Sequence, residues 1–239
     1  MLWPRRPDEI DVETGGGVVY RQAPHQVDSM RLLAGGRIRS VRAGTGQWLA
    51  ARDKAPGFYH AFFEFEDGTP ATLTYNAYGY FMATELFDPD QSGPANPNLQ
   101  TRLQARREVT GNLRDEMAAK EEWTLSRQRT GVRSGRGSNL MFDLGLLIVS
   151  CEQGDMRQSQ NGLYVYSNEG TTEISVDAWS GPRSPELDEL YDALYHEKPV
   201  LHSGQWGLAT LEACLAIMQS GREHREITLQ HQVSVPEGV

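Results

Sequence analysis

The hydrophobic and polar positions of this chain change their period twice, from helical spacing to alternation and back. Near the start, Val27, Met30 and Arg31 lie on one helical face, which predicts a helix over residues 24–34. Pro24 suits its first turn because proline has no N–H to leave unpaired, and a glycine pair follows its end.

An alternating pattern follows this helix and predicts an antiparallel meander at residues 38–48, 59–65 and 71–81. Glu66-Asp67-Gly68 is a hairpin signal, because glycine tolerates a positive φ. Further strands are predicted at residues 140–151, 156–159, 163–167, 171–176 and 227–229. Asn161-Gly162 predicts a type I′ turn between two of them.

Two helices are predicted near the end, at residues 184–194 and 205–220. Ser184 is a natural N-cap, with Pro185 in the first turn, and Gly221 is the expected cap of the second helix. The apolar stripes of the two helices are Leu187, Leu190, Tyr191 and Leu194, and Leu208, Leu211, Leu215 and Met218.

These elements predict an α+β fold: one large, mostly antiparallel open sheet of six to eight strands with helices packed on one face. Residues 1–239 are expected to form a single domain. Large aromatic groups are expected on the uncovered face, where water contact is unfavourable: Trp48, Phe62, Tyr75, Tyr78 and Tyr80. A homo-oligomer joined through this face, or a partner domain, is the predicted cover.

Residues 88–137 interrupt the pattern as a charged insertion. Residues 99–137 hold nine Lys/Arg against five Asp/Glu, so the segment is basic within an acidic chain. Such insertions are typical of lids, interface arms or flexible segments. Its arginines either rim a binding pocket or form a solvated helix face: Arg102, Arg106, Arg107, Arg127 and Arg129.

Composition excludes several classes of protein. The longest apolar stretch, residues 144–149, is far too short to span a membrane, and no secretory signal opens the chain. Two cysteines predict a reducing cytoplasm rather than a disulfide framework, and the net charge of −9 argues against nucleic-acid binding. The histidines have no compact ligand spacing, so no metal is expected.

Residues 15–28, GGGVVYRQAPHQVD, resemble the pattern GGG-x-x-x-D-x-G-x-H-x-x-D of the Gfo/Idh/MocA oxidoreductase family. Residues 199–208 and 216–222 resemble the closing helix of the same C-terminal domain, so the resemblance covers nearly the whole chain. The form RQ-x-x-HQ-x-D and the basic insertion are similar to the phthalate cis-dihydrodiol dehydrogenase branch. The implied fold is the dihydrodipicolinate-reductase-like C-terminal domain.

The resemblance implies the substrate-binding and oligomerisation domain of an NAD(P)-dependent oxidoreductase. Its substrate would be a small molecule, a carbocyclic diol or sugar-like alcohol, including a carboxylated cis-dihydrodiol. The family's Rossmann domain, with its glycine fingerprint, is not recognised here. NAD or NADP is therefore expected for the full-length enzyme and none on this chain alone, which is expected to be inactive.

The resemblance makes His25 the candidate catalytic residue, assisting proton transfer while the main acid/base lysine lies in the Rossmann domain. That lysine belongs to a Glu-Lys-Pro motif; Glu197-Lys198-Pro199 follows a C-terminal helix instead and is interpreted as coincidence. The alternative for His25 is a helix-start histidine satisfied by hydrogen bonds. Asp28, one turn further on, either orients His25 or caps the helix.

Arg21 stands where the usual family pattern has Asp. A guanidinium there would bind a substrate carboxylate bidentately, and the alternative is a surface or interface salt bridge. Gln22, Gln26 and Asp28 are the other predicted substrate-binding residues. The Gly15 triplet provides close approach to the other domain or simple flexibility.

A second class of function stays open. The chain is either the substrate half of a dehydrogenase, with a separate Rossmann domain as partner, or a stand-alone, non-catalytic binding or assembly module derived from that family.

Overall fold

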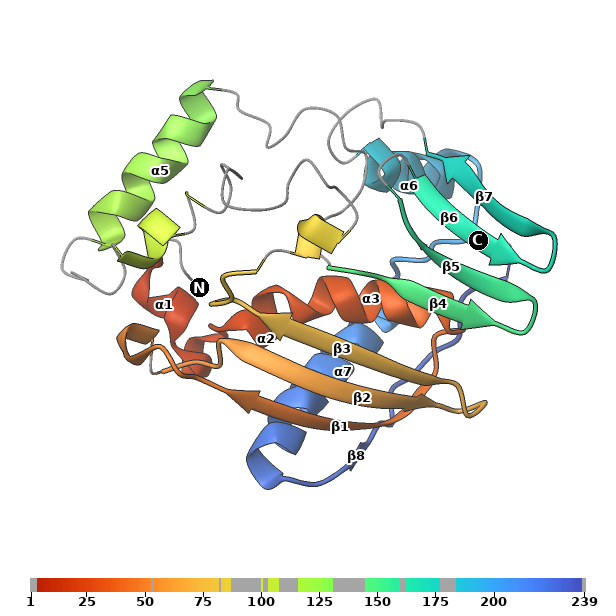
Figure 1. Cartoon of the computed structure of the whole chain (residues 1–239), viewed down its shortest axis with the longest axis horizontal. Helices are drawn as coiled ribbons and strands as arrows, with labels where there is room; N and C mark the ends of the chain where they lie inside the picture. The colour runs from red at the N-terminus through yellow and green to blue at the C-terminus, as the bar shows by residue number, and fades with distance from the viewer. Residues whose placement is uncertain are drawn as a thin grey trace. The chain divides into compact units, whose positions relative to one another are not determined.

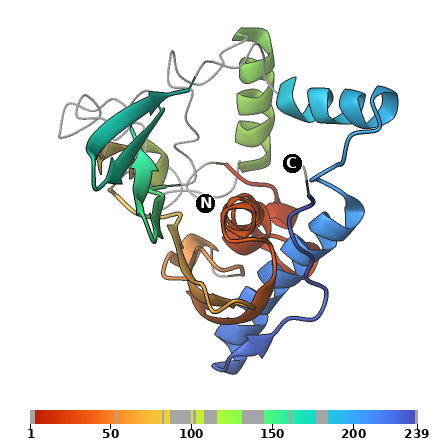
Figure 2. The same ribbon diagram turned by 90° about the vertical axis from the view of Figure 1, so that its right-hand side faces the viewer.

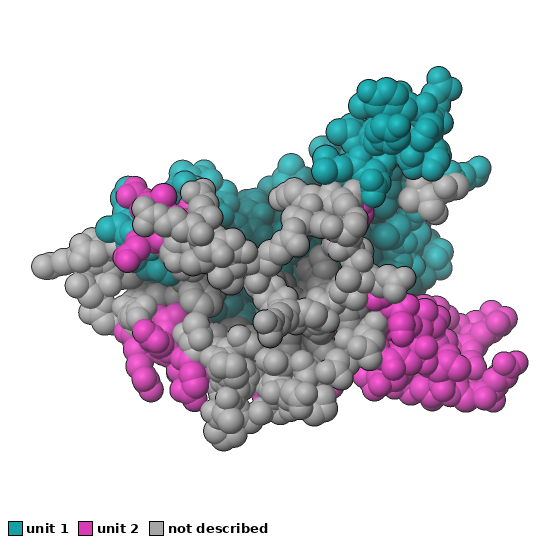
Figure 3. All heavy atoms as spheres, turned by 90° about the horizontal axis from the view of Figure 1, so that it is seen from above, with its two compact units in different colours: residues 1–78, 109–120, 187–239 teal, residues 79–108, 121–186 magenta. Residues whose placement is uncertain are grey.

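The computed structural model describes residues 4–52, 54–81, 83–86, 100, 103–107, 116–130, 145–159, 162–176 and 184–237. Its internal contacts define two compact units, coloured separately in Figure 3. The first comprises residues 1–78, 109–120 and 187–239, and the second residues 79–108 and 121–186. Within the described residues, no helix is long and apolar enough to cross a membrane.

The first unit is built on a four-stranded antiparallel sheet in the order β3-β2-β1-β8 (Figure 1). The strands are β1 Ile38–Gly46, β2 Phe58–Phe65, β3 Pro70–Asn76 and β8 Ile227–Thr228. In β2, alternate side chains from Tyr59 to Phe65 are buried. One face of the sheet therefore carries the core, and the predicted meander is confirmed.

Along the chain, the helices of this unit come before and after the strands of its sheet. They are α1 Pro7–Ile10, α2 Val18–Arg21, α3 Ala23–Leu33, α6 Ser184–Tyr195 and α7 Gly204–Glu223, with the 3-10 turns η1 Val12–Thr14 and η2 Ala50–Arg52. α7 packs against β1 and α3, and Figure 2 shows α3 nearly end-on with α7 beside it. α5 Glu116–Thr130 begins in this unit.

The buried face of α7 differs from the predicted leucine stripe. Leu208, Leu211 and Leu215 are about half exposed, at 50%, 47% and 47%. The helix instead turns its small residues inward, together with Trp206 and Ile217. Small side chains allow the helix backbone to lie close to β1, which a row of leucines would prevent.

The predicted cap of α7 is also wrong. Gly221 lies inside the helix, where a Cβ would collide with the Thr45 side chain of β1. The helix ends two residues later, and His224 provides the left-handed cap with a φ of 53°. Gly221 is thus needed for close packing rather than for termination.

The stripe of α6 is exposed rather than packed. Leu187, Leu190 and Leu194 are 63%, 56% and 68% exposed. The helix bounds are confirmed, whereas burial of its apolar side is not seen among the described residues.

Arg31 lies fully buried where α3, α7 and the C-terminal segment meet. Its guanidinium donates to the carbonyl oxygens of Gly36, Trp206 and Val233 at 3.0, 3.0 and 3.3 Å, and to Thr210 Oγ1 at 2.7 Å. It also stacks 3.8 Å from the centre of the Trp206 ring. One side chain therefore joins three segments that are distant in sequence.

The expected aromatic surface is smaller than predicted. Tyr75 stacks on Tyr59 at 5.9 Å on the covered face, and Tyr78 is buried. Trp48 and Phe62 are exposed in this unit. The uncovered face is otherwise largely polar, with His60 bonded to Thr74, an Arg39–Glu64 ion pair and the exposed Thr72. This face therefore offers a partner less apolar surface than predicted.

The second unit holds a four-stranded antiparallel sheet in the order β4-β5-β6-β7. Its elements are β4 Ile148–Cys151, β5 Gly154–Gln158, β6 Gly162–Ser167, β7 Gly170–Ser175 and the 3-10 turn η3 Ala83–Leu86. The α+β class with antiparallel strands is confirmed. The eight described strands form two sheets instead of the single continuous sheet predicted. Most of the insertion at residues 88–137 lies outside the described residues.

Candidate functional site

The glycine triplet shapes the entry to α2 and α3. Gly17 adopts a φ of 96° and donates to the Glu9 carbonyl at 3.1 Å. A Cβ on Gly16 would lie 2.7 Å from the backbone of Asp11. The triplet therefore forms a bonded turn packed against the chain's own residues 9–11, and simple flexibility does not describe it.

His25 lies in the first turn of α3 with its side chain exposed. Its carbonyl oxygen accepts a hydrogen bond from Ser29 Oγ at 3.0 Å. No residue in the described part of the chain hydrogen-bonds its imidazole. The alternative of a histidine satisfied by neighbouring groups is therefore not supported, and its catalytic role stays a prediction.

Arg21 ends α2, and its side chain is 40% exposed. Its Nη1 lies 3.2 Å from Oε1 of the buried Glu9. The salt bridge expected as the alternative is thus present. It involves one edge of the guanidinium, which has further N–H donors.

The two glutamines predicted to bind substrate differ in burial and in their contacts. Gln26 is buried and accepts a hydrogen bond from the Tyr59 hydroxyl, which ties α3 to β2. Burial raises the pKa of Tyr59. Gln22 is half-buried between α2 and α3, and its N–H donates to the Val18 carbonyl at 2.8 Å. Gln26 therefore ties α3 to β2, and its contact with substrate stays a prediction.

Asp28 takes neither of the two roles expected from its position. Its carboxylate accepts from Trp206 Nε1 at 2.5 Å and from Thr210 Oγ1 at 3.2 Å. His202 Nε2 lies 3.6 Å away, and His202 Nδ1 is 2.5 Å from Glu189 of α6. The hydrogen bond that the His202 imidazole donates to Glu189, helped by the charge of Asp28, raises the pKa of His202. Sequence spacing gave no signal for this carboxylate–imidazole–carboxylate arrangement.

Other histidines pair with single carboxylates. His196 Nδ1 lies 2.8 Å from Asp192 and His231 Nδ1 3.1 Å from Glu212. Searching the residues that the structure describes yields no group of three metal-ligating side chains. Lys198 is also exposed and engaged with Asp192, at 2.6 Å.

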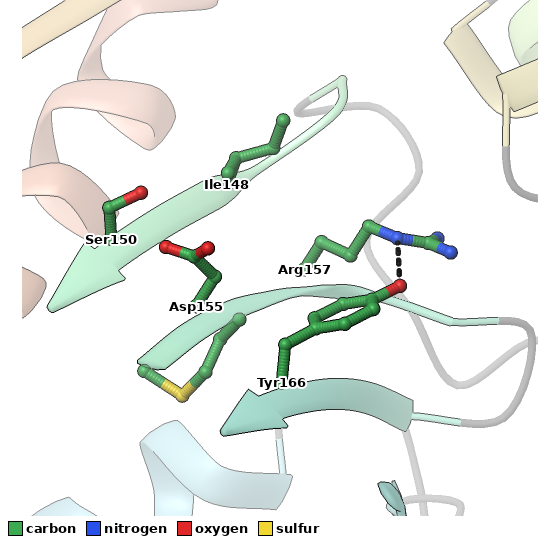
Figure 4. A pocket seen from close by; sticks show the side chains of 6 residues that line it. Ile148, Ser150, Asp155, Arg157 and Tyr166 are labelled. Atoms are coloured by element: carbon green, nitrogen blue, oxygen red, sulfur yellow. Dashed lines mark hydrogen bonds between the residues drawn. The ribbon is translucent and has the colours of Figure 1, made fainter. Parts of the chain in front are cut away.

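A hollow of about 240 Å³ lies on the second unit's sheet (Figure 4). Arg157 Nε donates to the Tyr166 hydroxyl at 2.9 Å beside it. Its lining is Ile148, Ser150, Asp155, Met156, Arg157 and Tyr166, so it includes none of the predicted site residues.

The described residues do not form a Rossmann-type dinucleotide site. A Rossmann site needs parallel strands joined through a glycine turn and a helix. All strand pairs described here are antiparallel, and the glycine triplet leads into a four-residue helix.

Comparison with known proteins gives consistent matches. The GFO/IDH/MocA C-terminal domain family matches residues 1–86. The 1-carboxy-3-chloro-3,4-dihydroxycyclohexa-1,5-diene dehydrogenase of Comamonas testosteroni is 32% identical over 223 residues, which are 92% of this chain and 55% of the relative.

Solved structures agree. A protein of Bordetella bronchiseptica RB50, assigned as a dehydrogenase, is 33% identical with a TM-score of 0.74, over 95% of this chain and 59% of that one. The WlbA dehydrogenase of Bordetella pertussis, in complex with NADH and UDP-GlcNAcA, shares the fold at 18% identity and a TM-score of 0.51, over 96% and 52%.

The chain thus spans a little over half the length of these relatives. The fold, the GGG-to-Asp28 segment and the matches agree with one another. Residues 1–86 therefore match the C-terminal domain of the GFO/IDH/MocA family, and the chain as a whole is similar to part of each of these dehydrogenases.

Proposed function

We propose that this chain is the substrate-binding domain of an NAD(P)-dependent dehydrogenase acting on a carboxylated carbocyclic diol. The observation that carries the proposal is an exposed imidazole, His25, four residues after an exposed guanidinium, Arg21. The name of the Comamonas relative describes a ring with one carboxyl and two hydroxyl groups. A ring of this kind supports the proposal, because it offers a hydroxyl group to His25 and a carboxylate to Arg21.

In this proposal, His25 accepts or relays the proton of the hydroxyl group that is oxidised. Imidazole suits the task because its ordinary pKa lies near neutrality. Arg21 binds the ring carboxylate with two parallel N–H bonds, which fixes the ring's orientation as well as its position. Gln22 contributes a further polar contact, and Gln26 and Asp28 hold α3 in place from beneath.

In this proposal, a Rossmann domain outside the described residues binds the dinucleotide, which would accept the hydride, and provides the main acid/base lysine. The described residues of this chain bind and orient the substrate in this proposal, and they do not hold the cofactor. We further propose a homo-oligomer through the uncovered sheet face, supported by the exposed Trp48 and Phe62. Light scattering that gives a monomer would contradict the oligomer.

The test is a fusion of this chain to the Rossmann domain of a family relative, assayed with a carboxylated cis-dihydrodiol and NAD⁺ or NADP⁺. We expect reduced nicotinamide to form with the fusion and not with the chain alone. A fusion that binds the diol but never oxidises it would favour the stand-alone binding module. NAD(P)H fluorescence titration of the chain alone is the companion measurement, and tight binding there would overturn the assignment of the cofactor to another domain.

A further inference from the structure

A group of cations surrounds one buried carboxylate in the first unit. Glu9 Oε1 lies 3.7 Å from Arg5 Nη1, 3.2 Å from Arg21 Nη1 and 3.4 Å from Lys120 Nζ. Glu9 Oε2 accepts from the Arg6 N–H at 2.8 Å. The four side chains Arg5, Glu9, Arg21 and Lys120 are called the Glu9 cluster below.

The Glu9 cluster carries more positive than negative charge. Arg5 and Arg21 against Glu9 leave a net charge of +1, and Lys120 raises the sum over the four side chains to +2. The adjoining Arg52 does not change this count, because Glu116 pairs with it. A partly shielded excess of positive charge attracts an anion.

Arg5 provides a second, independent indication. Its Nε is buried and has no hydrogen-bond partner among the residues described. Burial lowers the pKa of Arg5, and the charges of Arg21 and Arg52 lower it further, while Glu9 opposes them. A buried charged donor without an acceptor is unfavourable, so an anion that reached this guanidinium would stabilise it.

The cluster is still open to solvent. The side chains of Arg5, Arg21 and Lys120 are 21%, 40% and 17% exposed, whereas that of Glu9 is 4% exposed. An incoming anion therefore meets the cations and not the carboxylate that holds them.

We propose that Arg5 and Arg21 together bind the carboxylate of the substrate ring, with Glu9 as the positioning residue that holds both guanidinium groups and Lys120 adding positive potential. The inference rests on the proposed function, because Arg21 precedes His25 by four residues. It adds Arg5, Glu9 and Lys120 to a site that sequence alone assigned to Arg21.

The experiment is calorimetric titration of the whole chain with cyclohex-1-ene-1-carboxylate and, as its neutral match, cyclohex-1-ene-1-carboxamide. We expect the carboxylate to bind, the amide to bind at least tenfold more weakly, and added salt to weaken the carboxylate. Arg5→Gln and Arg21→Gln should each weaken the carboxylate by about tenfold, the effect of one charge-assisted hydrogen bond. The control Arg37→Gln, which removes an exposed arginine paired with Glu66, should leave affinity unchanged.

Glu9→Gln is the sharpest variant, because it removes negative charge beside the cations while keeping the side chain's shape. With the circular dichroism spectrum unchanged, it should tighten carboxylate binding several-fold, because the amide oxygen of glutamine still accepts from the guanidinium groups while the competing negative charge is gone. Weaker binding by that folded variant would overturn the proposal. If Glu9→Gln unfolds, the exposed Arg21→Gln decides alone, and unchanged affinity there overturns it.

Inorganic phosphate is the third probe. Tighter binding of phosphate than of the ring carboxylate would overturn the carboxylate assignment. These titrations need neither cofactor nor turnover. Carboxylate binding without dehydrogenase activity in the fusion refutes only the proposed function, and activity in the fusion without Arg5-dependent binding refutes only this inference.

Discussion

Replacing Arg31 with methionine is the most informative test of how the first unit is held together. The change keeps an unbranched apolar stem but removes the guanidinium and its four hydrogen bonds, three of them to the carbonyls of Gly36, Trp206 and Val233. Those oxygens then lose a charged donor that they share. Removing a hydrogen bond to a charged group costs about 1.5 to 3 kcal/mol, and because these four bonds share one guanidinium their losses do not add, so we expect a total of about 3 to 5 kcal/mol that includes the lost stacking on Trp206.

For a chain of this length, that loss corresponds to a fall in melting temperature of roughly 10 °C. Burial lowers the pKa of Arg31 to about 10, so the guanidinium stays charged at neutral pH and the loss applies there. The assay is urea unfolding followed by tryptophan fluorescence, with Arg31→Lys expected between wild type and Arg31→Met. Arg37→Met, which removes an exposed ion pair with Glu66, is the matched control and should leave the midpoint unchanged. Equal urea midpoints for Arg31→Met and Arg37→Met would refute the role of Arg31 in joining the three segments.

Three further predictions concern packing and titration. Gly221→Ala should destabilise the chain by about 1 to 3 kcal/mol, because the new methyl group collides with Thr45. Gly207→Ala on the same helix meets no neighbouring atom and should stabilise the chain by about 0.5 to 1 kcal/mol. Equal urea midpoints for the two variants would contradict this difference. His202 has a raised pKa in the folded state, so its stabilising contribution is complete below the ordinary imidazole value and is lost as pH rises through the raised one. A pH series of urea midpoints should show that loss in the wild type and not in His202→Gln. Burial, with a smaller effect of Asp28, raises the pKa of Cys214 to about 12, so a thiol reagent should modify exposed Cys151 in the native chain and both cysteines only in urea; native modification of Cys214 would contradict its burial.

Strand and helix positions followed from the sequence where local pattern decides them. β2 alternates between buried and exposed residues, and the turn after it contains Gly68 at a φ of 88°. The bounds of α3 and α6 also follow, because a proline near each start and the apolar spacing act within the helix itself.

Packing partners did not follow, because they depend on distant segments. The leucines of α7 are more hydrophobic than its alanines, but the alanines and Gly221 are the buried residues, because only small side chains allow close contact with β1. Arg31 looks like an ordinary polar position until Trp206, Thr210 and Val233 surround it.

The candidate site shows the same division. His25, in the first turn of α3, and Arg21, at the end of α2, are both exposed, as a site requires. Asp28 and Gln26 turn inward, because their partners Trp206 and Tyr59 come from α7 and β2. Arg5 and Glu9 carried no sequence signal, since nothing in their local pattern brings Lys120 beside them.

The proposed role of His25 is proton transfer in a dehydrogenase whose substrate domain is this chain. Its most direct test is steady-state oxidation of a carboxylated cis-dihydrodiol by the Rossmann fusion, comparing wild type with His25→Ala. Loss of a general acid/base group should lower kcat by about 10² to 10⁴. Arg21→Gln should mainly raise KM, because it removes binding rather than chemistry. An unchanged kcat and KM in a folded His25→Ala fusion would contradict the account.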